Sequence, residues 1–192
     1  MGYNSSTTYN FTAFTEADLL AAGSGNGNDL GYGDTFTMPG CASVEFSVTD
    51  DDNSLSGDSR RNENANDRSG QTASITQDGQ EIGNDGQIYA EGYFWVCDQD
   101  GNWYLLIEIE QEGGGDDYFA FHEGYGIPPA GAELTVSCGG NISCWEPKFD
   151  DLTGGEIKSG PEAINDAITI TEDESIGDAG DDAQLNILAN DS

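Results

Sequence analysis

Residues 86–112, GQIYAEGYFWVCDQDGNWYLLIEIEQE, contain two long β-prone runs on either side of Asp100-Gly101. This dipeptide between such runs is a strong hairpin signal, because both residues accept the positive φ angles of a tight turn. Successive side chains of a strand point to opposite faces, so the second run divides into two sets. One face is apolar and comprises Trp103, Leu105, Ile107 and Ile109. The other becomes acidic toward its end and comprises Tyr104, Leu106, Glu108 and Glu110.

Shorter strands are indicated on both sides of this hairpin. Residues 42–48, ASVEFSV, alternate apolar and polar side chains, and residues 72–82 contain a second hairpin signal at Asp78-Gly79. Two more strands are predicted within residues 117–123 and 132–139. Regularly spaced strands with turn residues between them predict an all-β fold, an antiparallel β-sandwich or jelly roll with long acidic loops.

Helical periodicity is nearly absent from the chain. It is limited to residues 15–23, TEADLLAAG, where Thr15 can cap a short helix and Gly23 can end it. We therefore expect residues 1–34 to form an N-terminal extension with a short helix, ahead of a β-sandwich domain at 35–155.

The charge of the chain limits its partners. Among 192 residues, 37 are Asp or Glu and 5 are Lys or Arg, which gives a net charge of −32. Such a chain repels nucleic acid and anionic membrane surfaces, and it lacks the long apolar run that membrane insertion requires. Acidity of this degree is typical of proteins adapted to salt, or of extracellular proteins whose carboxylates bind calcium.

One acidic run invites a metal interpretation. Asp50, Asp51, Asp52 and Asp58 lie at the end of the predicted strand 42–48, where a loop can place several oxygens around one calcium ion. The alternative is a solvated acidic rim with nearby arginines as counter-ions, namely Arg60, Arg61 and Arg68. Both interpretations remain open at this point.

A second acidic pair precedes the predicted strand 117–123. Asp116 and Asp117 could share an ion with another strand end, or they could simply be solvated. The spacing of Asp98, Asp100 and Asn102 resembles the start of an EF-hand loop, but Trp103 occupies the position where that loop needs glycine. A hairpin turn explains these three residues without a metal.

Catalytic groups are scarce in this sequence. His122 is the single histidine, so a serine or cysteine nucleophile would depend on it, and we predict a non-enzymatic protein. Two carboxylates suffice for glycoside hydrolysis, and the same strand also carries aromatic side chains. The alternative function is thus carbohydrate binding or carbohydrate chemistry on an aromatic and glutamate face, comprising Trp103, Tyr104, Glu108 and Glu110. These aromatics could equally fill the core.

Four cysteines, an even number, are consistent with an oxidising extracellular location. They allow three disulfide pairings. The short loop between Cys138 and Cys144 favours a local bridge, which leaves Cys41 to pair with Cys97.

The composition changes near Pro161, which predicts a linker at residues 156–164. Beyond it, Asn165-Asp166, the β-prone run 168–170, Glu172-Asp173 and the final LNILANDS resemble the opening of the cadherin-like, VCBS-type repeats of secreted bacterial adhesins and RTX proteins. The resemblance implies that residues 165–192 are the incomplete start of such a β-repeat. It also implies calcium ligands at the repeat junction, with candidates Asp166, Glu172, Asp173 and Asp191.

The larger part of the chain carries a second resemblance. Strings such as FSVTDDDNSLSGD, GQIYAEGYFWV and IPPAGAELTV are similar to the N-terminal segment of secreted proteins of marine alphaproteobacteria, some of which carry a Hint self-processing domain. This resemblance implies type I export, calcium and an extracellular or cell-surface location. The start of the chain lacks the basic and apolar regions of a secretory signal peptide, which agrees with that route.

These observations together predict an extracellular, calcium-binding β-sandwich module of a larger secreted adhesin or matrix protein. Its expected partners are calcium ions and cell-surface or matrix glycans or proteins.

Overall fold

The computed structural model describes residues 6–20, 30–57, 71–112, 117–142 and 145–156. The chain divides into two compact units, residues 1–160 and 161–192, and all described residues belong to the first. This division falls inside the predicted linker. The predicted C-terminal repeat, with Asp166, Glu172, Asp173 and Asp191, lies outside the described residues.

Antiparallel strands dominate the described part of the chain and confirm the predicted all-β fold. The strands are β1 (Thr7–Thr15), β2 (Thr35–Thr37), β3 (Val44–Asp50), β4 (Thr72–Gln77), β5 (Gln80–Asp98), β6 (Trp103–Gln111), β7 (Tyr118–His122), β8 (Glu133–Asn141) and β9 (Leu152–Thr153). The helical segments are α1 (Glu16–Leu20) and two single 3-10 turns, η1 (Glu123–Tyr125) and η2 (Phe149–Asp151). No helix of the described residues is long and apolar enough to cross a membrane.

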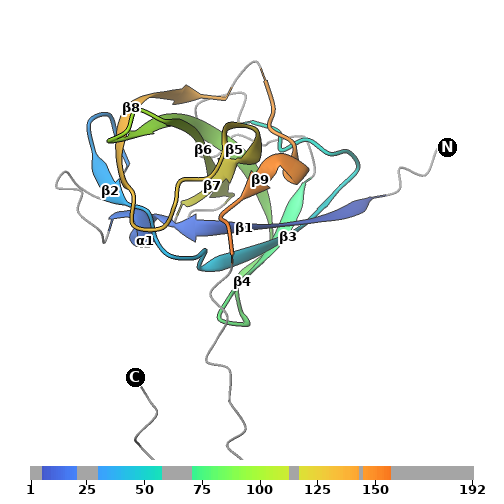
Figure 1. Cartoon of the computed structure of the whole chain (residues 1–192). Helices are drawn as coiled ribbons and strands as arrows, with labels where there is room; N and C mark the ends of the chain where they lie inside the picture. Colours follow the sequence, from blue (N-terminus) through green and yellow to red (C-terminus); the bar gives the residue numbers. More distant parts are fainter. Residues whose placement is uncertain (1–5, 21–29, 58–70, 113–116, 143–144, 157–192) are drawn as a thin grey trace, which may run out of the picture. The chain divides into compact units, whose positions relative to one another are not determined.

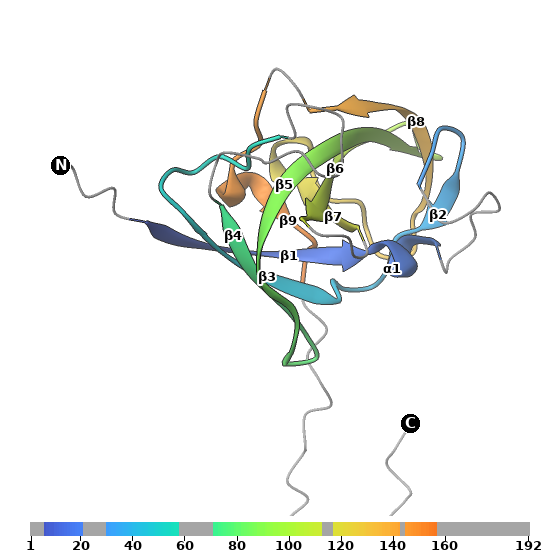
Figure 2. The same cartoon turned by 180° about the vertical axis from the view of Figure 1, so that it is seen from behind.

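The strands form a closed ring in the order β5-β4-β3-β1-β7-β6, and β6 pairs again with β5. Two strands make this closure: β1 pairs with β3 along most of its length and with β7 at its end, and β5 pairs first with β4 and then with β6. Figure 2 shows β5 as a long curved strand that passes from β4 to β6. The two sheets of the predicted sandwich are therefore joined along both edges, and the strands close into a barrel.

The remaining strands extend this barrel. β8 pairs with the second half of β5 and carries β2 on its other edge, and β9 pairs with β7 (Figure 1).

Both predicted hairpins are present. Asp78 and Gly79 have φ angles of 51° and 73° and connect β4 to β5. In the turn between β5 and β6, the Asp98 carboxylate accepts hydrogen bonds from the backbone N–H groups of Asp100 and Asn102, at 3.0 and 2.9 Å. The Asn102 side chain, which also donates to this carboxylate, is the main cause that lowers the pKa of Asp98. Protein donors thus occupy the carboxylate, as the hairpin interpretation expects.

Two apolar clusters form the core. The first fills the barrel interior and includes the stacked rings of Phe11 and Phe46, whose centroids are 4.8 Å apart. The second lies on the other face of β6 and β7, where Leu19 of α1 and Phe36 of β2 pack against residues such as Phe121. β6 is therefore buried on both faces from Tyr104 to Ile107, and its acidic residues Glu108 and Glu110 alternate onto the face of the second cluster.

The prediction of an N-terminal extension at residues 1–34 differs from the structure in one respect. β1 lies within residues 1–34, yet it is an integral strand of the barrel, with Phe11 and Ala13 in the interior cluster. The short helix begins where predicted: the Thr15 hydroxyl accepts a hydrogen bond from the backbone N–H of Asp18, and the Asp18 carboxylate accepts one from the backbone N–H of Thr15.

The cysteines do not form the favoured pairing. Cys41, Cys97 and Cys138 are free thiols in the structure, so no bridge joins Cys41 to Cys97. Cys144 lies outside the described residues.

Candidate functional site

A β-bulge in β5 changes which side chains of this strand face the barrel interior. Ala90 pairs with Ile109 and Gly92 with Glu108, so Glu91 is an extra residue in the ladder. Ile88 and Ala90 contribute to the interior cluster before the bulge, whereas Tyr93 and Trp95 pack against that cluster after it. The bulge therefore shifts the alternation of β5 by one residue.

Three carboxylates converge next to this bulge. Glu91 of β5, Glu110 of β6 and Asp117, directly before β7, each offer one oxygen, and these oxygens lie within 4.8 Å of one another. None of the three residues is exposed. Within the described ranges, this is the one group of three or more side chains that could hold a metal ion.

A fourth carboxylate, Glu108, experiences the charge of this group. Burial, followed by the charges of Glu91, Asp117, Glu16 and Glu110, raises the pKa of Glu108 to about 8. Glu16 is the first residue of α1, and its backbone N–H donates to the carbonyl oxygen of Asp117 at 3.0 Å. We refer to Glu16, Glu91, Glu108, Glu110 and Asp117 as the acidic cluster.

Gly92 makes room for this cluster. A Cβ atom at position 92 would lie 2.6 Å from Glu108 Oε2, which is too close for any larger residue without movement of the glutamate. Glycine in the interior of a strand commonly marks a bulge or a close approach of this kind. The backbone and the carboxylate thus fit each other.

The acidic cluster suits a hard divalent cation. Calcium binds six to eight oxygens at about 2.3–2.6 Å, so oxygens around one ion lie up to about 5 Å apart. The 4.8 Å limit of Glu91, Glu110 and Asp117 matches this range. Glu108 and Glu16 are the neighbouring carboxylates that could complete the ligand set, together with backbone oxygens or water.

The predicted run Asp50–Asp52 behaves differently. Asp50 ends β3 and is buried, and its carboxylate accepts a hydrogen bond from the backbone N–H of Asp51 at 2.8 Å. Asp51 and Asp52 are exposed, and the run is not part of the converging group. Asp58 and Asp116 lie outside the described residues.

Protein contacts hold the segment after this run. Asn53 Nδ2 donates to the Asp150 carboxylate at 2.6 Å, and the backbone N–H of Leu55 donates to the carbonyl of Pro147 at 2.8 Å. Leu55 itself is buried in the interior cluster. These contacts fit a structural loop.

The four residues of the predicted sugar-binding face do not share one surface. Trp103 is 52% exposed, whereas Tyr104 is 8% exposed, packs against Phe121 and donates its hydroxyl to Asp98 at 3.1 Å. Glu108 and Glu110 belong to the acidic cluster. Glu91 and Glu16 were missed from the sequence, although Gly92 within a strand pattern indicates a bulge beside Glu91.

An aromatic pocket lies on the other side of β5 and β6. Its volume is about 340 Å³, and its lining residues are Tyr93, Trp95, Leu105, His122, Tyr125 and Trp145. Five of these six residues carry an aromatic ring. We call this the aromatic pocket.

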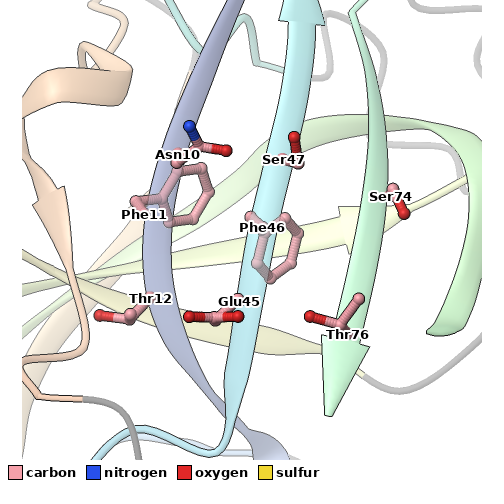
Figure 3. Close-up of a pocket in the computed structure, with 8 residues that line it drawn as sticks. All are labelled: Asn10, Phe11, Thr12, Glu45, Phe46, Ser47, Ser74 and Thr76. Atoms are coloured by element: carbon pink, nitrogen blue, oxygen red, sulfur yellow. The ribbon is translucent and has the colours of Figure 1, made fainter. Parts of the chain in front are cut away.

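A second hollow, of about 290 Å³, lies over β1, β3 and β4 (Figure 3). Its polar lining consists of Asn10, Thr12, Glu45, Ser47, Ser74 and Thr76. The two phenylalanines drawn there, Phe11 and Phe46, belong to the interior core. With one carboxylate among hydroxyls and an amide, the hollow has hydrogen-bonding groups but not the ligand set of a metal.

Comparisons with known proteins give no relative to guide the assignment: no family model, curated protein or solved structure matches the chain.

Proposed function

We propose that residues 7–156 form a non-enzymatic, calcium-binding β-barrel module of a larger exported protein that acts in adhesion or matrix binding outside the cell. The observation that carries the proposal is the convergence of Glu91, Glu110 and Asp117 within 4.8 Å. The net charge of −32 and the resemblance of the C-terminal residues to calcium-binding adhesin repeats support it. The expected external partners are glycans or proteins of a cell surface or matrix.

Calcium would stabilise this module by balancing charge that the fold has brought together. Burial, together with the charges of Glu91, Asp117, Glu16 and Glu110, raises the pKa of Glu108, so like charges act on this carboxylate in a partly buried region. A bound divalent cation reverses this effect and favours the ionised form of Glu108. Calcium binding should therefore release a proton near neutral pH, and affinity should rise as the pH approaches about 8.

The test is thermal unfolding of the full chain with chelator, calcium, magnesium and sodium chloride at matched ionic strength. We expect a calcium-specific rise in Tm, because a ligand at 100 times its Kd stabilises the native state by about 2.7 kcal/mol. General screening would instead give equal rises in all the salts.

Matched double variants locate the site. Glu110→Gln with Asp117→Asn should abolish the calcium-specific rise, whereas Asp51→Asn with Asp52→Asn should retain it. Both pairs remove two negative charges, so a difference between them reports position. A rise that survives the first pair and disappears in the second would disprove the acidic cluster as the calcium site.

Trp103, Tyr104, Glu108 and Glu110 do not form one carbohydrate-binding face. Tyr104 is buried against the core, and the two glutamates lie in the acidic cluster.

A further inference from the structure

The aromatic pocket is built from four separate parts of the chain. Tyr93 and Trp95 come from β5 after the bulge, Leu105 from β6, His122 and Tyr125 from the continuous segment of β7 and η1, and Trp145 follows β8. Tyr93, Trp95 and Trp145 pack against the interior cluster at its edge and are half-buried, while Tyr125 is 49% exposed. The pocket therefore has a floor of core residues and an open side.

The rings stand at steep angles to one another. Trp95 and Tyr125 meet with centroids 4.9 Å apart and planes inclined by 84°, and Tyr93 and Trp145 lie 6.1 Å apart at 60°. His122 is inclined to Tyr125 by 67° and to Trp145 by 50°. Rings inclined in this way line the pocket from different directions. A flat sugar ring stacks best on a single open platform, which this arrangement does not supply.

The charge around the pocket favours a cation. Among the described residues, no lysine or arginine lines it. His122 Nδ1 accepts a hydrogen bond from the backbone N–H of Gly124 at 3.1 Å, which leaves the ring proton on Nε2. Nε2 lies 3.9 Å from a carboxylate oxygen of Asp151. The aromatic faces add the negative side of their quadrupoles to the field of a chain with charge −32.

From this geometry and charge we propose that the aromatic pocket binds a methylated ammonium group, as carried by a small quaternary ammonium compound. Several ring faces around one site attract such a cation through cation–π interactions, and its methyl groups match the apolar walls. The volume of about 340 Å³ is at the small end of the range for ligand pockets and suits a compact ligand. This site is separate from the acidic cluster, so the proposal does not rest on calcium binding.

The experiment titrates the full chain with choline and tetramethylammonium, and ligand-observed NMR reports binding through the ligand methyl signals. The matched control ligand is 3,3-dimethyl-1-butanol, which has the shape of choline without its charge. We expect both cations to bind saturably and the neutral analogue to bind at least about tenfold more weakly. Sodium chloride at equal ionic strength controls for screening, and glucose tests a sugar ligand.

Two variants assign binding to the pocket. Tyr125→Leu and Trp145→Leu should each weaken choline binding by about tenfold or more, since each removes one ring wall. Trp103→Leu, which removes an exposed tryptophan outside the lining, should leave it unchanged. Thermal unfolding checks that each variant is folded. Tyr125→Leu should disturb the fold less than Trp145→Leu, because Tyr125 is exposed.

Three results would overturn the proposal. Equal binding of the neutral analogue would show a merely apolar pocket, and binding of glucose but not choline would show a sugar site. Absence of saturable choline binding in the millimolar range would show that the pocket does not recognise the cation.

Discussion

Two acidic regions of this protein have opposite origins. Asp50, Asp51 and Asp52 are neighbours in the chain, and yet Asp50 is buried at the end of β3, while Asp51 and Asp52 are exposed beyond it. Glu91, Glu110 and Asp117 are far apart in sequence, and yet their oxygens lie within 4.8 Å. Density of charge along the chain therefore does not predict convergence of ligands, which depends on the register between strands.

The two regions also differ in what holds them in place. The segment after Asp50–Asp52 is tied to the barrel by hydrogen bonds from protein groups, including the side chain of Gln71. The acidic cluster is held by backbone pairing of β5, β6 and β7 against the repulsion of its own charges. We therefore expect calcium to stabilise the second region and not the first.

The largest expected effect on stability comes from Gln71. This side chain is 0% exposed, accepts a hydrogen bond from the backbone N–H of Ser56 and donates to the carbonyls of Ser56 and Ile88. Gln71→Met leaves buried backbone groups without these partners, so we expect a loss of about 2–4 kcal/mol in the free energy of unfolding. Denaturant unfolding measures this loss.

The control for this change is Gln99→Met, at an exposed turn position, which should be nearly neutral. Calcium should stabilise the Gln71 variant and the unchanged protein equally. Preferential rescue of the variant by calcium would instead show that the segment after Asp50–Asp52 is a metal loop, and the contrast between the two regions would fail.

The second prediction concerns pH in the absence of metal. The native pKa of Glu108, about 8, is above its ordinary value of 4.5, so the native state binds more protons than the unfolded state between these limits. Stability should therefore fall as the pH rises from about 4.5 to about 8. Glu108→Gln removes this penalty, and we expect a gain of about 1–2 kcal/mol above pH 8, with part of the shift screened by solvent.

Thermal unfolding in chelator across this pH range measures the effect. Glu133→Gln, an exposed carboxylate of β8, should leave the profile unchanged. Identical pH profiles for the Glu108 variant and the unchanged protein would show that the carboxylates of the acidic cluster do not act on one another.

The smallest expected effect on stability comes from a substitution at Gly92. Gly92→Ala places a Cβ 2.6 Å from Glu108 Oε2, and the glutamate can turn away because its end is flexible. We expect a stability cost of roughly 1 kcal/mol and a calcium affinity lower by about tenfold, the usual penalty for displacing a residue beside a metal site. Gly40→Ala, with no atom within 4 Å of its added Cβ, is the matched control. Calorimetric titration with calcium gives both affinities, and equal values would remove Glu108 from the calcium site.

Local patterns predicted most of the strands. The alternation of Val44, Phe46 and Val48 gives β3 its buried face, and the two Asp-Gly pairs lie in the expected hairpin turns. β1 carries a similar alternation, with Phe11 and Ala13 buried, and the same criterion would have found it. Its place between β3 and β7 could not be derived, because each pairing joins residues far apart in the chain.

The candidate site was predicted only in fragments. Glu110 and Asp117 were among the predicted site residues, but in different sites, as a sugar ligand and a metal ligand. The bulge at Glu91 shifts the alternation of β5, and it decides that Tyr93 and Trp95 face the aromatic pocket while Glu91 joins the acidic cluster. Strict alternation of side chains along β5 would instead place Glu91 on the same face as Tyr93 and Trp95.

The sequence by itself determined the charge of −32, the all-β character, the hairpins and the alternation within single strands. These properties depend on composition or on the preferences of a few neighbouring residues. Only the tertiary structure decided that the strands close into a barrel, that the Asp50–Asp52 run stays outside the converging group and that distant carboxylates converge. The physical reason is that strand register and bulges set which side chains meet, and both arise from pairing between segments that are remote in the chain.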